Sequence, residues 1–317
     1  MLIDSHIHIW SFPAFRDLSP YIRTMEDAIA FRTRHPDIYK KALTEQANDN
    51  TDDLIADMDK NGVDFALVQA RPGTVTNDMV AQAAARHPRL AALARVGHDQ
   101  QVGRYLEDPA PAREQAPGEL DHALTTLGMT GIGELFIRAL TNEIHHERIA
   151  KDLDGVMRVA AKHKVPVQFP TAYSQFPGGL FYGDPLWVDE VAARHPEVPI
   201  ILTKMGRGIT TYFDSTMTVA MRNANIYLDV VGTTGPHLRI AIDKLGADRI
   251  MFGTDWSATW RWLSVPGTLH QIRMKALDNA ELTAAEREQI QWKTAAKLFR
   301  LAPQLQQAGL MPGEAAE

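Results

Sequence analysis

Two histidines stand close to the start of the chain, at positions 6 and 8. Three isoleucines within residues 1–10 make this segment an apolar run of the length expected for a buried strand. Side chains alternate along a strand, so His6 and His8 share one face of it. Each neutral imidazole offers one nitrogen lone pair, and the pair therefore predicts a chelate for a divalent metal ion. The remaining ligands must come from elsewhere in the chain.

The elements that would supply them repeat regularly along the sequence. Seven further apolar, β-branched runs are predicted as strands, at residues 63–70, 90–96, 129–137, 165–169, 198–203, 226–231 and 249–253. Helical patterns separate them, which implies parallel strands joined by right-handed crossovers. Eight such units in 317 residues favour a closed (β/α)8 TIM barrel of the α/β class. An open doubly wound sheet is less favoured, because no glycine-rich phosphate loop follows the first strand.

Three stretches depart from this repeat. Residues 11–50 are rich in aromatic side chains and proline, and we expect a lid or helical excursion there. Residues 108–118 are predicted as a polar, proline-bearing loop, and the chain from about residue 263 is predicted to be helical. No change of composition divides the chain, so we expect one domain over residues 1–311 and a disordered tail at 312–317.

Composition narrows the class of partner. The net charge of −6 argues against a nucleic-acid-binding surface, which needs a basic patch. The absence of cysteine excludes disulfides and thiolate chemistry. No segment has the pattern of a signal peptide or the length of a spanning helix. We therefore expect a cytoplasmic protein that binds a small molecule and neither nucleic acid nor a membrane.

In a barrel of this kind, chemistry takes place where the strands end. Polar or aromatic side chains at or just beyond predicted strand ends are Arg71, Glu134, Gln168, Tyr173, Lys204, Arg207, Asp229, Asp255 and Trp256. Asp255 ends the eighth strand, which lies beside the first when a barrel closes. It can then meet His6 and His8, and either bind a metal ion or take a proton from metal-bound water. Two histidines with one carboxylate form a metal site known from hydrolases and oxygenases.

These residues carry a resemblance to a known family. The His-x-His of the first strand and the Gly-Thr-Asp-Trp at residues 253–256 resemble the amidohydrolase superfamily. Residues 166–171 and 200–206 resemble the fifth and sixth strands of its amidohydrolase-related branch. That branch includes aminocarboxymuconate semialdehyde decarboxylase, resorcylate-type decarboxylases and pyrone-dicarboxylate lactonases.

The chain departs from that family at two positions. Relatives carry a metal-binding histidine where this chain has Pro170, and often a second histidine where it has Lys204. Three alternatives follow. A metal ion is held by His6, His8 and Asp255 with Glu134 completing the set; or Lys204 replaces the metal as a fixed cation; or the protein is a non-catalytic partner of an active paralogue.

The resemblance implies an enzyme acting on a small cyclic or aromatic carboxylic acid. We expect a metal-dependent hydrolase of a lactone or amide, with Asp255 and Lys204 as catalytic residues. The divalent metal is expected to be zinc, with manganese or iron as alternatives. Substrate contacts are expected from Arg207, Arg71, Gln168, Tyr173 and Trp256. Non-oxidative decarboxylation is the nearest alternative, and a dinuclear iron oxygenase is another. We expect a homodimer, with a hetero-oligomer containing a paralogue as the alternative.

Overall fold

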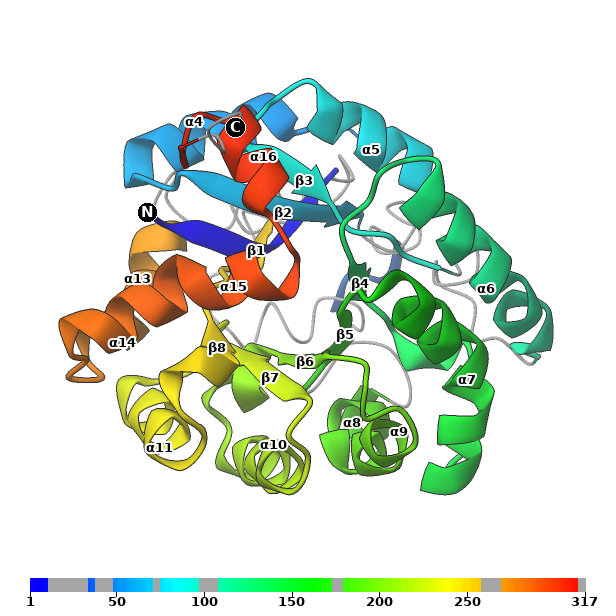
Figure 1. Ribbon diagram of the computed structural model, residues 1–317. Coiled ribbons are helices and arrows are strands. Elements are labelled where there is room, and N and C mark those ends of the chain that lie inside the picture. The colour runs from blue at the N-terminus through cyan, green and yellow to red at the C-terminus, as the bar shows by residue number, and fades with distance from the viewer. Residues whose placement is uncertain are drawn as a thin grey trace, which may run out of the picture.

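Parallel strands ringed by helices form a (β/α)8 barrel (Figure 1), and the predicted fold class is confirmed. The structure is a computed structural model that describes residues 1–10, 34–37, 48–70, 75–96, 108–172, 179–257 and 269–312. The strands are β1 (Ile3–Ile9), β2 (Phe65–Ala70), β3 (Leu90–Ala92), β4 (Ile132–Glu134), β5 (Val167–Pro170), β6 (Ile200–Thr203), β7 (Ile226–Asp229), β8 (Ile250–Met251) and β9 (Trp256–Ser257).

Most helices pack on the outside of the strands, and the last ones close one end of the barrel. The α-helices are α4 (Thr51–Asn61), α5 (Asn77–Ala85), α6 (Ala110–Thr125), α7 (His146–His163), α8 (Gly179–Gly183), α9 (Val188–Arg194), α10 (Thr210–Arg222), α11 (Gly235–Leu245), α13 (Leu269–Asp278), α14 (Ala284–Glu288), α15 (Thr294–Leu298) and α16 (Ala302–Gln307). Shorter helical segments are η3 (Ile137–Ala139), η4 (Pro185–Trp187), η5 (Lys204–Gly208), η6 (Ala247–Arg249) and η7 (Gln289–Lys293). None of the described helices combines the length and apolar character needed to cross a membrane.

The strands pair in two parallel sheets, in the orders β3-β2-β1-β9 and β4-β5-β6-β7-β8. Backbone hydrogen bonds join the sheets at both seams. At one seam the Ala94 N–H donates to the Gly131 carbonyl at 2.8 Å. At the other, the Ser5 N–H donates to the Phe252 carbonyl at 3.0 Å. These bonds place β1 directly beside the end of β8, which is the neighbourhood that a closed barrel requires.

An irregularity in β1 decides which of its side chains face the barrel interior. The register against β2 shifts between Asp4 and Ile7. Ile3 belongs to the apolar cluster at the inner base of the barrel, whereas Ile7 belongs to the layer between strands and helices. A bulge re-aims the side chains that follow it. Because of this bulge, the first half of β1 contributes an apolar side chain, Ile3, to the base of the barrel interior. The second half contributes the polar side chains of His6 and His8 nearer to the strand ends.

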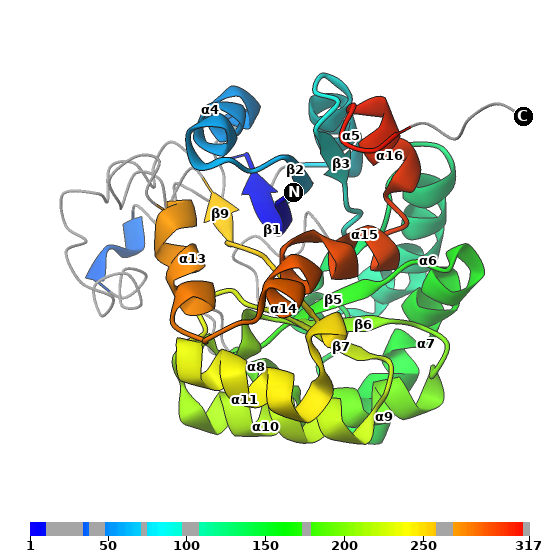
Figure 2. The ribbon, with the colours of Figure 1, turned by 60° about the vertical axis from the view of Figure 1, so that its left-hand side comes forward.

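The inner base of the barrel is closed by the C-terminal helices. Phe65, Leu67 and Met251 from the strands form one buried cluster with Leu298 of α15 and Leu305 of α16. Figure 2 shows these last helices packed together near the N-terminus of the chain. The predicted helical C-terminal region is thus present, and it covers the end of the barrel opposite to the strand ends.

The region 108–118 contradicts the loop prediction, because most of it belongs to α6. Pro111 stands in the first turn, where its missing N–H costs no helical hydrogen bond. Pro117 lies inside the helix and packs against Gly155 of α7, where any side chain would collide with the proline ring at 2.8 Å. Packing against α7 therefore overrides the local preference of proline for a loop.

Candidate active site

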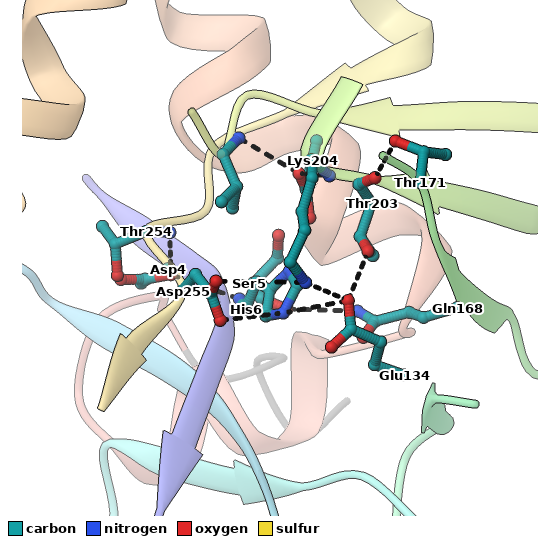
Figure 3. A network of polar contacts seen from close by, with 12 residues as sticks. Asp4, Ser5, His6, Glu134, Gln168, Thr171, Thr203, Lys204, Thr254 and Asp255 are labelled. Atoms are coloured by element: carbon teal, nitrogen blue, oxygen red, sulfur yellow. Dashed lines mark hydrogen bonds and ion pairs between the residues drawn. The ribbon is translucent and has the colours of Figure 1, made fainter. Parts of the chain in front are cut away.

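Four buried ionisable side chains converge where the strands end. His6 and His8 come from β1, Glu134 from the last position of β4, and Asp255 from the segment that follows β8. Each is at most 3% exposed. Figure 3 shows His6 between Asp255 and Glu134, with Lys204 beside them. The structure therefore brings together the residues proposed as metal ligands from the sequence.

Three of these residues have the geometry of a metal-binding set. The distances are 3.3 Å from His6 Nε2 to His8 Nε2, 3.4 Å from His8 Nε2 to Asp255 Oδ1, and 3.7 Å from His6 Nε2 to Asp255 Oδ1. Two ligand atoms about 2.1 Å from one zinc ion lie roughly 3.4 Å apart when the geometry is tetrahedral. His6, His8 and Asp255 therefore fit one divalent ion without a large rearrangement.

Glu134 lies on the other side of the two imidazoles. Its Oε2 is 3.5 Å from His8 Nε2, and its Oε1 is 3.7 Å from His6 Nε2. Its Oε1 also accepts a hydrogen bond of 2.7 Å from the Thr203 hydroxyl. The ammonium group of Lys204 contacts the same oxygen. Glu134 thus has Oε2 available toward the histidines while Oε1 is engaged by β6 and η5.

Both histidines are held by their Nδ1 atoms. Nδ1 of His6 lies 2.7 Å from Asp229 Oδ2, and Nδ1 of His8 lies 3.2 Å from the Ala70 carbonyl oxygen. Since both partners accept hydrogen bonds, each Nδ1 carries the proton and each Nε2 directs its lone pair into the cluster. Two such lone pairs 3.3 Å apart require a positive charge between them, which a metal ion or a proton supplies.

The pKa values agree with one shared positive charge in the metal-free protein. Burial and Lys204 both disfavour a charged His6, but Glu134 and Asp229 outweigh them and raise the pKa of His6 to about 9. Burial lowers the pKa of His8 to about 4, despite the neighbouring Glu134 and Asp255. The two rings therefore differ in protonation, and a divalent cation fits the same electrostatic position.

Asp255 stays ionised in this environment. Burial alone would raise the pKa of its carboxyl group, but Lys204, His6 and Arg207 lower it well below the usual range. The Arg207 guanidinium donates from Nη2 to Asp255 Oδ2 at 2.9 Å, and Lys204 Nζ lies 3.9 Å from the same oxygen. One carboxylate oxygen thus faces the histidines and the other faces two cations.

The backbone around these groups is strained. Lys204, Met205 and Arg207 have φ values of 72°, 40° and 53°, and Asp255 has a φ of 58°. Non-glycine residues in this left-handed region cost roughly 1–3 kcal/mol each, and such strain concentrates at functional sites. The Asp229 carboxylate supports the first of these turns, because its Oδ1 accepts the Lys204 N–H at 2.6 Å.

Asp229 is the residue whose role sequence reasoning missed. The sequence places Asp229 at the polar end of a predicted strand, but nothing in it assigns this carboxylate a task. In the structure one oxygen orients His6 and the other accepts backbone N–H groups of Lys204 and Val231. The sequence signal for Asp229 is its position at the end of β7. Many carboxylates with a purely structural role occupy such positions, so the signal does not identify a functional residue.

The proposed substrate contacts have different outcomes. Arg207 lies beside Asp255 at the site. Gln168 is fully buried below it, where it donates to the Ser5 carbonyl at 3.2 Å and accepts from Gln69. Arg71 and Tyr173 lie outside the described residues.

Trp256 requires a correction. It pairs with Ile7, whose side chain faces the helices, and its indole N–H donates to Asp57 of α4 at 2.9 Å. The side chain is fully buried. Trp256 therefore packs outside the barrel instead of contacting a substrate.

Fold and site together define a TIM-barrel enzyme with a buried His-His-Asp centre at the strand ends. The amidohydrolase family model matches residues 3–301, so the chain belongs to the amidohydrolase family. The resemblance expected from the His-x-His and Gly-Thr-Asp-Trp motifs is confirmed. No curated protein sequence matches the chain.

Solved structures with the same fold include enzymes of two reaction types. The chain is similar to 5-carboxyvanillate decarboxylase LigW from Sphingomonas paucimobilis (19% identity, 94% of this chain and 98% of that chain, TM-score 0.60). It is similar to the 5-carboxyvanillate decarboxylase of Novosphingobium aromaticivorans, solved with manganese and a nitrobenzoic acid (16%, 95% and 97%, TM-score 0.62). It is also similar to a probable 2-pyrone-4,6-dicarboxylic acid hydrolase from Acinetobacter baumannii, solved with citric acid (14%, 94% and 99%, TM-score 0.58).

Proposed function

We propose that the chain is a metal-dependent hydrolase of a lactone or amide bond in a small cyclic or aromatic carboxylic acid. The observation that carries this proposal is the convergence of His6 Nε2, His8 Nε2 and an ionised Asp255 within 3.3–3.7 Å. Membership of the amidohydrolase family supports an enzyme of this kind, and one structural neighbour is a probable 2-pyrone-4,6-dicarboxylic acid hydrolase.

His6, His8 and Asp255 would hold the metal, with an oxygen of Glu134 beside them as a fourth donor. The donor set of imidazoles and carboxylates suits zinc and also manganese. A bound divalent ion supplies Lewis acidity, which polarises a carbonyl and lowers the pKa of water. The manganese bound in related structures makes that ion the alternative to zinc.

The residues of the chain have separate tasks in hydrolysis. Asp255, whose carboxylate is ionised, accepts the proton of the attacking water and passes it to the leaving oxygen or nitrogen as the carbon–oxygen or carbon–nitrogen bond breaks. Lys204 lies on the outer side of Asp255 and stabilises negative charge that develops on the substrate carbonyl oxygen. Asp229 keeps the Nε2 atom of His6 directed into the site.

The substrate class rests on charge and on the similar proteins. The positively charged groups of Lys204 and Arg207 beside a metal site favour an anionic substrate. The similar structures are named for 5-carboxyvanillate and 2-pyrone-4,6-dicarboxylic acid, which are both ring-containing carboxylic acids. We extend this substrate class, but no individual compound, to the chain.

Decarboxylation of an aromatic acid is the second candidate, because several of the similar structures are decarboxylases. That reaction needs a group that delivers a proton to the ring carbon after carbon dioxide leaves. In this site Asp255 is the candidate for that proton transfer as well, so product analysis is what separates the two reactions.

Metal analysis and product analysis together test the proposal. The purified protein should contain about one equivalent of zinc or manganese, and His6→Ala and Asp255→Asn should lose both the metal and activity. His146→Ala is the matched control, because His146 is exposed at the start of α7. Hydrolysis of aryl lactones or amides in ¹⁸O-labelled water should place one label in the acid product. Release of carbon dioxide from aromatic acids without label incorporation would favour the second candidate, and metal-free active protein would overturn the proposal.

A further inference from the structure

Arg273 is a cation near the site that no step above uses. It lies on α13, which Figure 2 shows beside β9. Its Nε donates to the Thr254 carbonyl at 3.0 Å, directly before Asp255 in the chain. Its terminal Nη1 and Nη2 groups have no hydrogen-bond acceptor among the described residues, although the side chain is partly buried. A guanidinium that is held at Nε alone retains four N–H donors for another group.

Gly232 places this guanidinium next to Arg207. Gly232 follows β7 and has a φ of 70°, a conformation that glycine adopts without strain. A β-carbon at this position would lie 3.3 Å from Arg207 Cγ and 3.6 Å from Arg273 Nη1. The two arginine side chains therefore flank the same small residue, on the side of the site between β7 and β8.

The charges around Arg273 favour the binding of an anion there. Burial lowers the pKa of the Arg273 guanidinium and Arg207 adds to this effect, while Asp255 opposes it. The Asp255 carboxylate already accepts a hydrogen bond from Arg207 and lies against Lys204. Asp255 is thus already paired with two cations, and no acceptor among the described residues contacts the terminal donors of Arg273, which leaves them to a ligand.

We propose that Arg273 and Arg207 together bind a carboxylate group of the substrate on the β7–β8 side of the site. Guanidinium groups bind carboxylates through paired N–H donors, so two of them define both the charge and the orientation of the ligand. The inference deepens the proposed function, from which it takes the class of substrate. It adds α13 to the elements that contact the substrate.

A structural explanation competes with this proposal. Arg273 holds the Thr254 carbonyl, so it can position Asp255 without touching a substrate. The two roles differ in their dependence on ligand charge. A carboxylate subsite discriminates between benzoate and the uncharged benzamide, whereas a positioning role changes the binding of both compounds.

Equilibrium binding of these two probes separates the roles. We expect Arg273→Gln to weaken benzoate binding to the metal-loaded protein by about tenfold or more, since a charge-assisted hydrogen bond is lost. Benzamide binding should change less than twofold, and Arg273→Lys should retain part of the benzoate affinity. Arg287→Gln is the matched control, because Arg287 contacts Leu277 and Asp278 at the far end of α13.

Equal losses for benzoate and benzamide would assign Arg273 a positioning role and overturn the subsite. Unchanged benzoate binding in Arg273→Gln would also overturn it. These measurements need no turnover and include the metal content of each variant. A charge-dependent loss in a protein that hydrolyses no lactone or amide would therefore leave the subsite standing while the proposed function fails.

Discussion

The ammonium group of Lys204 is in direct contact with Oε1 of Glu134, inside the candidate active site. The two side chains are only 7% and 1% exposed, so both charges depend on each other for compensation. Lys204 stands where the family resemblance leads us to expect a histidine. In the structure its charge is balanced by the carboxylate that ends β4.

Removing one partner of this pair should lower the stability of the fold more than removing both partners together. Glu134→Gln leaves the buried Lys204 ammonium with Asp255, 3.9 Å away, as its nearest remaining carboxylate. Lys204→Met leaves the buried Glu134 carboxylate with His6, 3.7 Å away, as a partner. Each single variant should lower the free energy of unfolding by about 3 kcal/mol, and the double variant by clearly less than the sum. Urea unfolding of the four proteins, all prepared without metal, measures the coupling.

Metal analysis of the same variants tests whether Glu134 is a ligand. If His6, His8 and Asp255 are sufficient to bind the metal ion, Glu134→Gln retains the metal with only a modest loss of affinity. Loss of the metal comparable to that in Asp255→Asn would instead make Glu134 an essential ligand. Additive unfolding free energies in the preceding cycle would show that the Lys204–Glu134 contact contributes no coupling.

Asp229→Asn should weaken metal binding through His6. The amide keeps an oxygen that can accept the N–H groups of Lys204 and Val231, but it presents an NH₂ group where His6 Nδ1 needs an acceptor. The imidazole then favours the other tautomer, and the proton moves to the ligating Nε2. We expect roughly a 10- to 100-fold loss of metal affinity, measured by competition with a chelator.

Asp154→Asn is the matched control for that variant. Asp154 makes the same kind of carboxylate–imidazole contact, 2.9 Å to Nε2 of His195, on the outer helices. It should affect stability without changing metal affinity. If Asp229→Asn binds the metal as tightly as the unchanged chain, Asp229 does not orient His6 for metal binding.

The sequence was sufficient to predict the barrel and the convergence of His6, His8 and Asp255 in the candidate site. The strand and helix periods are strong, and the rule that chemistry lies at strand ends selected His6, His8 and Asp255. The links among side chains were not predictable, because they depend on contacts between distant positions. The His6–Asp229 contact joins residues 223 positions apart and depends on the rotation of one ring.

Two errors have a common physical cause. Strand-end position suggested that Trp256 faces a substrate, and proline content suggested a loop at residues 108–118. Both are local signals that tertiary packing overrides: the pairing of β9 with β1 turns Trp256 toward α4, and Gly155 makes room for Pro117 inside α6. Packing partners of this kind cannot be identified from the period of a single segment.

Trp256→Phe should therefore act on stability rather than on substrate binding. Phenylalanine keeps most of the buried ring but removes the N–H that donates to Asp57. We expect the free energy of unfolding to fall by about 1–3 kcal/mol, because a buried carboxylate oxygen loses a donor. Thermal unfolding and KM for a turned-over substrate measure the two effects. A large rise in KM with unchanged stability would restore the substrate-binding role.

Glu286 offers a pH-dependent test of the helices around the barrel. It belongs to the capping box of α14, where its Oε2 accepts the Thr283 N–H at 2.8 Å, and Arg239 of α11 donates to its Oε1 at 2.9 Å. These hydrogen bonds, with Arg239 the larger cause, lower the pKa of Glu286 from 4.5 to about 2. Since the folded protein binds this proton more weakly than the unfolded chain, the stabilisation is complete above pH 4.5 and declines as the pH falls toward 2.

Glu286→Gln should lower the free energy of unfolding by about 1 kcal/mol at pH 7, and its difference from the unchanged chain should shrink below pH 4.5. Glu288→Gln, which breaks an exposed pair with Lys293, should change stability little at any pH. Chemical unfolding of the three proteins between pH 3 and pH 7 measures this, and a cost of Glu286→Gln that stays constant over that range would contradict the linkage.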